Sequence, residues 1–336
     1  MRKSLSLQKL FPVLLLVAAL FVPFVVENSY GRHLFIIAFI YAIVASNWDL
    51  SLGYAGVFNF GHIAFFGIGV YGTGLAAKFL GIDPWLAMVL GGIAASVAGA
   101  IVALPVLRLK GIYVILVTFA FSQLVLQAVL SQSEMTGGTQ GLVRIPTISA
   151  FGYNFLRDYR LGYYYVALAL LALSTLFLRR LVGSDFGMSL RALRDNEDYA
   201  LARGIPTGLQ RLKVLIASAF FTGVAGGFYA VYLRVASPEV FGFSTVSLVL
   251  SMVLVGGIAT IYGPIVAAVL LTLTTEGLAH FAGMNESRFM LVAAMMLAIL
   301  LFLPKGLASL FTKGGSRKTS PAAKSGTTPT AVGAPQ

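Results

Sequence analysis

The chain has 336 residues, of which 58% are hydrophobic and 11% are charged, and its mean hydropathy is +0.88. This composition excludes a water-soluble domain and indicates an integral membrane protein. The formal net charge of +12 does not indicate a nucleic-acid-binding protein, because the basic residues alternate with apolar runs and no RNA- or DNA-binding motif is present.

Ten apolar runs along the chain are close to the length of a membrane-spanning helix, which needs about 20 residues at a rise of about 1.5 Å each. They cover residues 10–26, 33–52, 60–79, 84–105, 111–130, 161–178, 213–233, 244–260, 263–281 and 288–303. We therefore expect an all-α, polytopic membrane helix bundle of about ten spans. The first run follows basic residues as in a signal peptide, but no small-residue cleavage site follows Pro23, and we expect a retained span.

The basic residues predict the orientation of these spans. With the N-terminus inside, 17 of the 24 Lys and Arg residues lie on the cytoplasmic face, as the positive-inside rule requires. Both termini and residues 183–213 would then be cytoplasmic, and residues 131–160 would form an outer loop. Residues 1–311 would make up the transmembrane domain, and the polar, low-complexity tail 312–336 is expected to be disordered in the cytoplasm.

Two glycine-rich segments leave the number of full spans open. Segments 33–79 and 244–281 each contain only a weak break, so each is either a pair of full helices or one helix with a re-entrant half. The glycines between residues 48 and 74 fit either close helix packing or unwound backbone beside a wet cavity.

Ionisable residues inside the apolar runs are few. Asp49 and His62 lie at the ends of their runs, so we expect both near the cytoplasmic surface, with His62 a neutral, hydrogen-bonded packing residue. Glu276 lies in the middle of a run, where a carboxylate is either functional or neutralised by a neighbouring helix. Because the chain has three histidines, no cysteine and no paired carboxylates, we expect no metal site.

Two polar segments lie outside the runs. The outer segment beginning at Thr136 is rich in glycine but lacks the Lys-Ser/Thr of a phosphate-binding loop, so it is either a simple turn or part of an outer site. In the inner segment, Asp195 or Asn196 could cap a short helix from Glu197 to Arg203 that ends at Gly204. So short a helix is marginal alone, which leaves an interfacial amphipathic helix or a docking site for a soluble subunit.

The inner segment carries a resemblance to a known family. The runs LRALRDNE from Leu190, ARGI from Ala202 and KVLIASAFFTGVAGGFYA from Lys213 are similar to permease subunits of bacterial ABC importers for branched-chain amino acids. The similarity is greater to the second, M-type, of the two paired permeases and extends, less densely, from about Trp48 to Gly306. In that family this loop is seated in a groove of the ATPase, and we call residues 183–213 the coupling segment.

The resemblance also assigns roles to individual residues. It implies ATPase coupling by Arg191, Arg194, Asp195, Asn196, Glu197, Ala202 and Gly204. It implies a translocation path beside Gly53, Gly56, Asn59, Gly61 and Phe65, to which Glu276 is added as an intramembrane carboxylate. It implies an outer mouth at Thr136, Gly137, Gly138 and Gly141. Asn59 departs from the family, which usually has serine at that position, so any inference about the substrate from this residue is weaker.

The function that the resemblance implies is ATP-driven import of leucine, isoleucine and valine across the bacterial inner membrane. Its implied partners are a second, homologous permease, two cytoplasmic ATPases that bind ATP-Mg, a periplasmic binding protein and membrane lipid. The chain has no Walker A motif, so we expect neither a cofactor nor ATP hydrolysis on it. Alternatives are a urea or short-amide permease of the same superfamily and an ion-coupled secondary transporter; a membrane enzyme or a structural scaffold has less support.

Overall fold

A computed structural model describes residues 7–26, 28–150, 153–155 and 160–282, and residues 294, 296, 297, 301, 306 and 307. Helices make up most of this part, so the predicted all-α membrane bundle is confirmed. The helices are α1 Leu7–Val25, α2 Ser29–Asp49, α3 His62–Phe79, α4 Pro84–Val106, α5 Ile112–Ser131, α6 Ser133–Thr136, α7 Leu161–Val182, α8 Asp185–Asp195, α9 Glu197–Ala202, α10 Thr207–Leu233, α11 Phe243–Gly256 and α12 Gly263–Ala282. Each of the first nine predicted spans coincides with one of these helices.

Most of the tenth predicted span, 288–303, and the whole of the tail 312–336 lie outside the described residues. Two of the described residues of this C-terminal part, Met296 and Leu307, contact α11. The Leu307 backbone N–H donates to the Val255 carbonyl at 2.8 Å, and the Ser251 hydroxyl lies 3.3 Å from the Met296 sulfur.

Five of the described helices are long and apolar enough to cross a membrane: α2 with its terminal turn, α4, α5, α7 and α10. By contrast, α11 has 14 residues, or about 21 Å of helix, against a hydrocarbon core of about 30 Å. It ends at Gly256, and non-helical residues 257–262, which we call the helix break, separate it from α12. Segment 244–281 therefore contains two helices, the short α11 and then α12, with the helix break between them.

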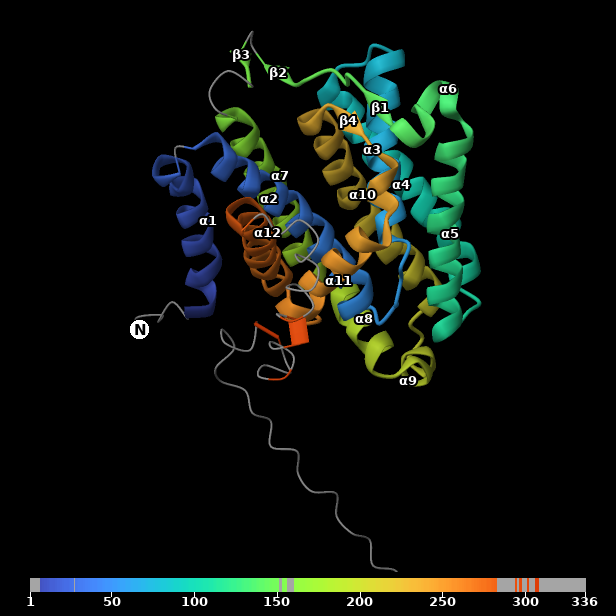
Figure 1. Ribbon diagram of the computed structural model, residues 1–336. Coiled ribbons are helices and arrows are strands. Elements are labelled where there is room, and N and C mark those ends of the chain that lie inside the picture. Colours follow the sequence, from blue (N-terminus) through green and yellow to red (C-terminus); the bar gives the residue numbers. More distant parts are fainter. Residues whose placement is uncertain are drawn as a thin grey trace, which may run out of the picture.

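Segment 33–79 is also interrupted. At its end α2 widens into a π turn, Leu50–Tyr54, a feature that often occurs at functional sites. Residues 55–61 are non-helical, and α3 begins at His62. The interruption lies at the end of the bundle where α8 is found (Figure 1).

Close packing of α3, α4 and α10 forms the centre of the bundle. A side chain at Gly69 would overlap the backbone of Gly223, and one at Gly226 would overlap the Phe66 carbonyl. Small residues let membrane helices approach in this way. Packing therefore accounts for part of the glycine-rich stretch, whereas Gly53 and Gly56 belong to the interruption.

The two ends of the bundle carry different structures, as Figure 1 shows: α8 and α9 lie at one end, and α6 and the short strands lie at the other. Strand β1, Leu142–Val143, pairs antiparallel with β4, Val235–Ala236, so that Leu142 is opposite Ala236. Strands β2, Ser149–Ala150, and β3, Tyr153–Asn154, form a hairpin. A 3-10 turn at Gly138–Gln140 and another at Pro238–Phe241 flank the β1–β4 pair.

Candidate functional site

The coupling segment folds as two short helices, α8 and α9, followed by the start of α10 at Thr207, and of the two short helices the sequence predicted only the second. The first, α8, buries Leu190 and Leu193 against the body of the protein. Gly187 lies so close to the Val182 backbone that no side chain fits there. These contacts pack α8 against the end of α7 and the body of the protein, so this part of the segment is not a free loop.

The second helix, α9, begins as predicted, with Asn196 as its cap. The Asn196 side chain accepts a hydrogen bond from the Tyr199 backbone N–H at 2.9 Å. Asp195, the other predicted cap, instead lies 3.0 Å from Arg194 in an ion pair. After Arg203 the helix stops at Gly204, whose φ of +78° favours glycine.

Glu197 ties α9 to two other elements. Its carboxylate lies 3.1 Å from Arg211 at the start of α10 and 3.4 Å from Lys110 in the α4–α5 connection. The side chains of Glu197 and Arg211 are 22% and 15% exposed, so water screens their attraction less than that of a surface pair. These contacts supply the support that so short a helix requires.

Arg194 links the coupling segment to the π turn. Its guanidinium Nη1 donates to the Gly53 carbonyl oxygen at 2.9 Å. A side chain at Gly56 would lie 3.0 Å from Arg194 Cγ, and the φ of Gly56 is +68°. The sequence placed Gly53 and Gly56 on a translocation path and Arg194 at an ATPase contact; the structure brings these residues together.

Asp49 extends this contact to the helix break. Its two carboxylate oxygens accept hydrogen bonds from the backbone N–H groups of Ala259 at 2.9 Å and Thr260 at 3.0 Å. The residue is only 1% exposed, so it is enclosed by protein; its depth near the cytoplasmic face stays a prediction. It is buried because the helix break leaves backbone donors without helical partners, and the carboxylate satisfies two of them.

Gly53 is the point where the π turn and the helix break touch. A side chain there would overlap both the Asp49 carboxylate and the Ala259 backbone. Arg194, Gly53, Asp49 and the helix break therefore form one contiguous set of contacts, which we call the coupling relay.

The other predicted path residues lie in the core. Asn59 is buried, and its side-chain oxygen accepts from the Gly61 backbone N–H at 2.7 Å, just before α3. Phe65 is buried against the His62 ring. Glu276 is part of α12, but its side chain lies outside what the structure describes. That these residues border a path stays a prediction.

His62 is buried and has the packing role that the sequence predicted; its depth near the cytoplasmic face stays a prediction. Its ring stacks on Trp48 with centroids 5.7 Å apart, and its Nδ1 lies 3.4 Å from the Asn59 side-chain nitrogen. Because Trp48 precedes Asp49 in the chain, this packing also fixes the end of α2 that carries the coupling relay.

A cavity of about 610 Å³ separates the coupling segment from α5. Gly56 and Phe58 line one wall, Ile112 lines another, and Arg194 and Glu197 close it from the side of the coupling segment. Protein interiors are close-packed and resist displacement. The cavity therefore marks a less densely packed region between the coupling segment and the body of the protein.

The outer segment at Thr136 is a built structure and not a simple turn. The Thr136 hydroxyl donates to the Val129 carbonyl at 2.6 Å. Gly137, Gly138 and Gly141 all have positive φ, and a side chain at Gly141 would overlap the Ala236 carbonyl. The segment is thereby held against the end of α10, at the opposite end of the bundle from α9 (Figure 1).

The comparisons with known proteins agree with this architecture. A family model described as the permease component of branched-chain amino acid transport systems matches residues 30–301. The chain belongs to this permease family. The high-affinity branched-chain amino acid permease protein LivM of Escherichia coli K12 is 31% identical over 321 residues, which cover 89% of this chain and 75% of the relative. The protein of the same name from Salmonella typhimurium LT2 shows the same figures.

A more distant relative extends the family to archaea. The probable branched-chain amino acid permease LivM of Methanocaldococcus jannaschii is 26% identical, over 80% of this chain and 90% of the relative. No solved structure matches the permease.

Three contributors to this site in the permease were not predicted: Asp49, Lys110 and Arg211. Lys110 and Arg211 were counted only as topological charges, because nothing in the sequence places the α4–α5 connection beside α9. Asp49 did give a signal, as a carboxylate at the end of an apolar run, but its partners lie 210 and 211 residues away.

Proposed function

We propose that this permease translocates leucine, isoleucine and valine across the bacterial inner membrane as one subunit of an ATP-driven importer. The observation that carries the proposal is the 31% identity, over 89% of the chain, to permeases named for branched-chain amino acid transport. We place both termini and the coupling segment in the cytoplasm, because 17 of the 24 Lys and Arg residues then lie on that side.

The proposed partners are a second permease, two ATPases that bind ATP-Mg and a periplasmic binding protein. The coupling segment offers a suitable surface for an ATPase, since Met188, Tyr199 and Leu201 are 59%, 55% and 49% exposed beside charged residues. Exposed apolar side chains of α4, such as Ile101 and Leu104, would face lipid or the second permease. The outer segment at Thr136 would receive the binding protein.

In the proposed mechanism, nucleotide-driven closure of the ATPases moves α8 and α9. Arg194 transmits this movement to the Gly53 carbonyl, and Asp49 passes it to the helix break between α11 and α12. The two interrupted segments, 33–79 and 244–281, then shift together. This shift closes the path to one side of the membrane and opens it to the other. By linkage, binding at the outer mouth affects nucleotide binding in return.

Uptake in proteoliposomes tests the proposal. The full chain is reconstituted with a candidate partner permease and ATPases, and uptake of labelled leucine is measured with the binding protein outside and ATP inside. We expect uptake that requires ATP and persists with an uncoupler. Uptake that survives without ATP but collapses with the uncoupler would indicate a secondary transporter, and transport of urea but not leucine would move the protein to the amide permeases.

A further inference from the structure

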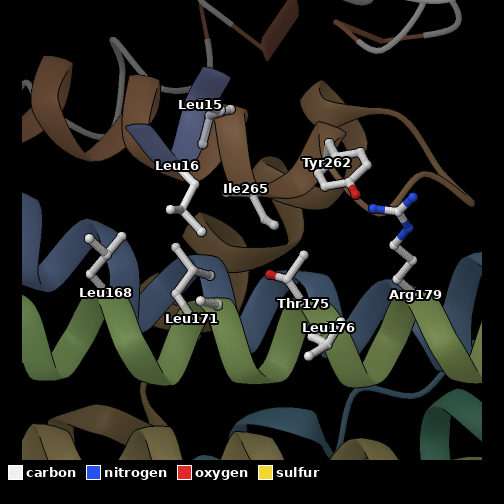
Figure 2. A pocket seen from close by; sticks show the side chains of 10 residues that line it. Leu15, Leu16, Leu168, Leu171, Thr175, Leu176, Arg179, Tyr262 and Ile265 are labelled. Atoms are coloured by element: carbon white, nitrogen blue, oxygen red, sulfur yellow. The ribbon is translucent and has the colours of Figure 1, made fainter. Parts of the chain in front are cut away.

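A groove between α1, α7 and the start of α12 takes no part in the coupling relay. It has a volume of about 250 Å³. Leucines of α1 and α7 line most of it, namely Leu16, Leu168, Leu171 and Leu176, and Arg179 and Tyr262 lie at one end. Figure 2 shows the apolar side chains facing one another, with the Arg179 guanidinium and the Tyr262 hydroxyl together beyond them.

The chemistry of the groove changes in one direction along α7. Leu168 and Arg179 are about 16 Å apart along the helix axis. The lining is mainly apolar at the Leu168 end, and the exposed Arg179 guanidinium lies at the other end, in the last turn of α7. Within the described part of the chain, Arg179 has no ion-pair partner. An apolar groove along a membrane-spanning helix with a cation at its end is complementary to a phospholipid, in which glycerol joins the acyl chains to an anionic phosphate.

The described residues of the chain do not fill this groove. In the C-terminal part, Met296 and Leu307 instead contact α11, at Ser251 and Val255. In addition, α1 packs only lightly on α7, so the groove can admit a chain from the surrounding bilayer. A lipid seated there would complete the contact between α1 and the rest of the bundle.

We propose that the groove binds one phospholipid with an anionic headgroup, its acyl chain between α1, α7 and α12 and its phosphate on Arg179 beside Tyr262. A basic residue near the membrane surface favours anionic lipid by about fivefold, which sets the expected preference. This site is independent of what the permease transports.

Native mass spectrometry of the full-length chain, released from nanodiscs of phosphatidylethanolamine with or without phosphatidylglycerol, tests the proposal. The wild type should retain one phosphatidylglycerol with a preference of about fivefold. The variant Arg179→Gln should lose the preference, whereas Arg180→Gln, its neighbour outside the groove, should keep it. Equal behaviour of the two variants would overturn the assignment of Arg179.

A second pair of variants separates the groove from a general charge effect. Ala172 lines the groove, so Ala172→Phe should fill it and lower retention of both lipids at least fivefold, whereas Leu173→Phe, on an exposed position outside the groove, should not. No difference between these two would overturn the site. Photocrosslinks from Leu176 that reach the protein's own tail or a second copy, and no lipid, would do the same.

Discussion

Arg194 and Gly53, 141 residues apart in the chain, are joined by a hydrogen bond of 2.9 Å from the guanidinium to the carbonyl oxygen. The bond connects α8, the first helix of the coupling segment, with the π turn at the end of α2. Gly53 in turn contacts Asp49 and the backbone of Ala259. A displacement of α8 can therefore reach both interrupted segments, 33–79 and 244–281, through these contacts.

Replacement of Arg194 by glutamine should uncouple ATP hydrolysis from transport. A hydrogen bond to or from a charged group contributes about 1.5 kcal/mol at the lower end of its range. We use the lower end because the Arg194 side chain is 37% exposed, and this free energy corresponds to about a tenfold change in an equilibrium constant. We expect ATP-dependent leucine uptake to fall about tenfold while the ATPase still co-purifies. The control is Arg180→Gln, an exposed arginine in the last turn of α7 outside the relay, which should leave uptake unchanged. Normal uptake by Arg194→Gln would remove that residue from the relay.

Neutralising Glu197 should loosen α9 from the body. Glu197→Gln weakens the ion pairs to Lys110 and Arg211, at a cost of about 1 kcal/mol for a partly exposed pair. We expect faster hydrogen exchange across residues 197–203 and earlier proteolysis at Arg203. Asp198→Asn, at an exposed position one residue further along the same helix, is the matched control. Unchanged exchange in Glu197→Gln would show that other contacts hold α9.

ATPase docking is better tested on the exposed apolar side chains of the coupling segment. Arg194 and Glu197 are less suitable, because their charged groups contact other parts of the same chain. Leu201→Asp should weaken co-purification of the ATPase at least tenfold without changing membrane insertion, because a carboxylate would be desolvated in the contact. Val143→Asp, also exposed but at the opposite end of the bundle, should have no effect. Equal losses in both variants would indicate a general folding defect.

Gly53 should tolerate no side chain. In Gly53→Ala the methyl group would overlap the Asp49 carboxylate and the Ala259 backbone, so we expect a loss of stability of about 1–3 kcal/mol. Gly72→Ala is the control, since its nearest neighbours would lie at 3.7 and 3.9 Å, an ordinary contact distance. Thermal unfolding in detergent compares the two; a Gly53→Ala protein as stable as Gly72→Ala would contradict the close approach.

The sequence predicted those features that depend on local pattern. Apolar runs located the spans, because the run is itself the membrane-spanning helix. The Asn196 cap located the start of α9, because a capping residue lies next to the first turn of its helix. The strand pair at Leu142 was not expected, since each strand has two residues and its partner lies near Ala236.

Contacts between distant segments were the part that could not be predicted. The burial of Asp49 depends on donors that the helix break exposes more than 200 residues later. The pairing of Glu197 with Lys110 similarly requires the α4–α5 connection to lie beside α9. No periodicity in the sequence encodes either neighbour.

The central claim is that nucleotide-driven movement enters the protein through α8 and α9. The chain has no cysteine, so a single Ala202→Cys variant carries one unique label position at an exposed site. Crosslinking from this position in membranes that contain the partner subunits tests the claim most directly. The account predicts capture of an ATP-hydrolysing subunit, with a yield that changes on addition of ATP. Failure to capture such a subunit, or labelling of the introduced thiol only from the outer side of the membrane, would contradict it.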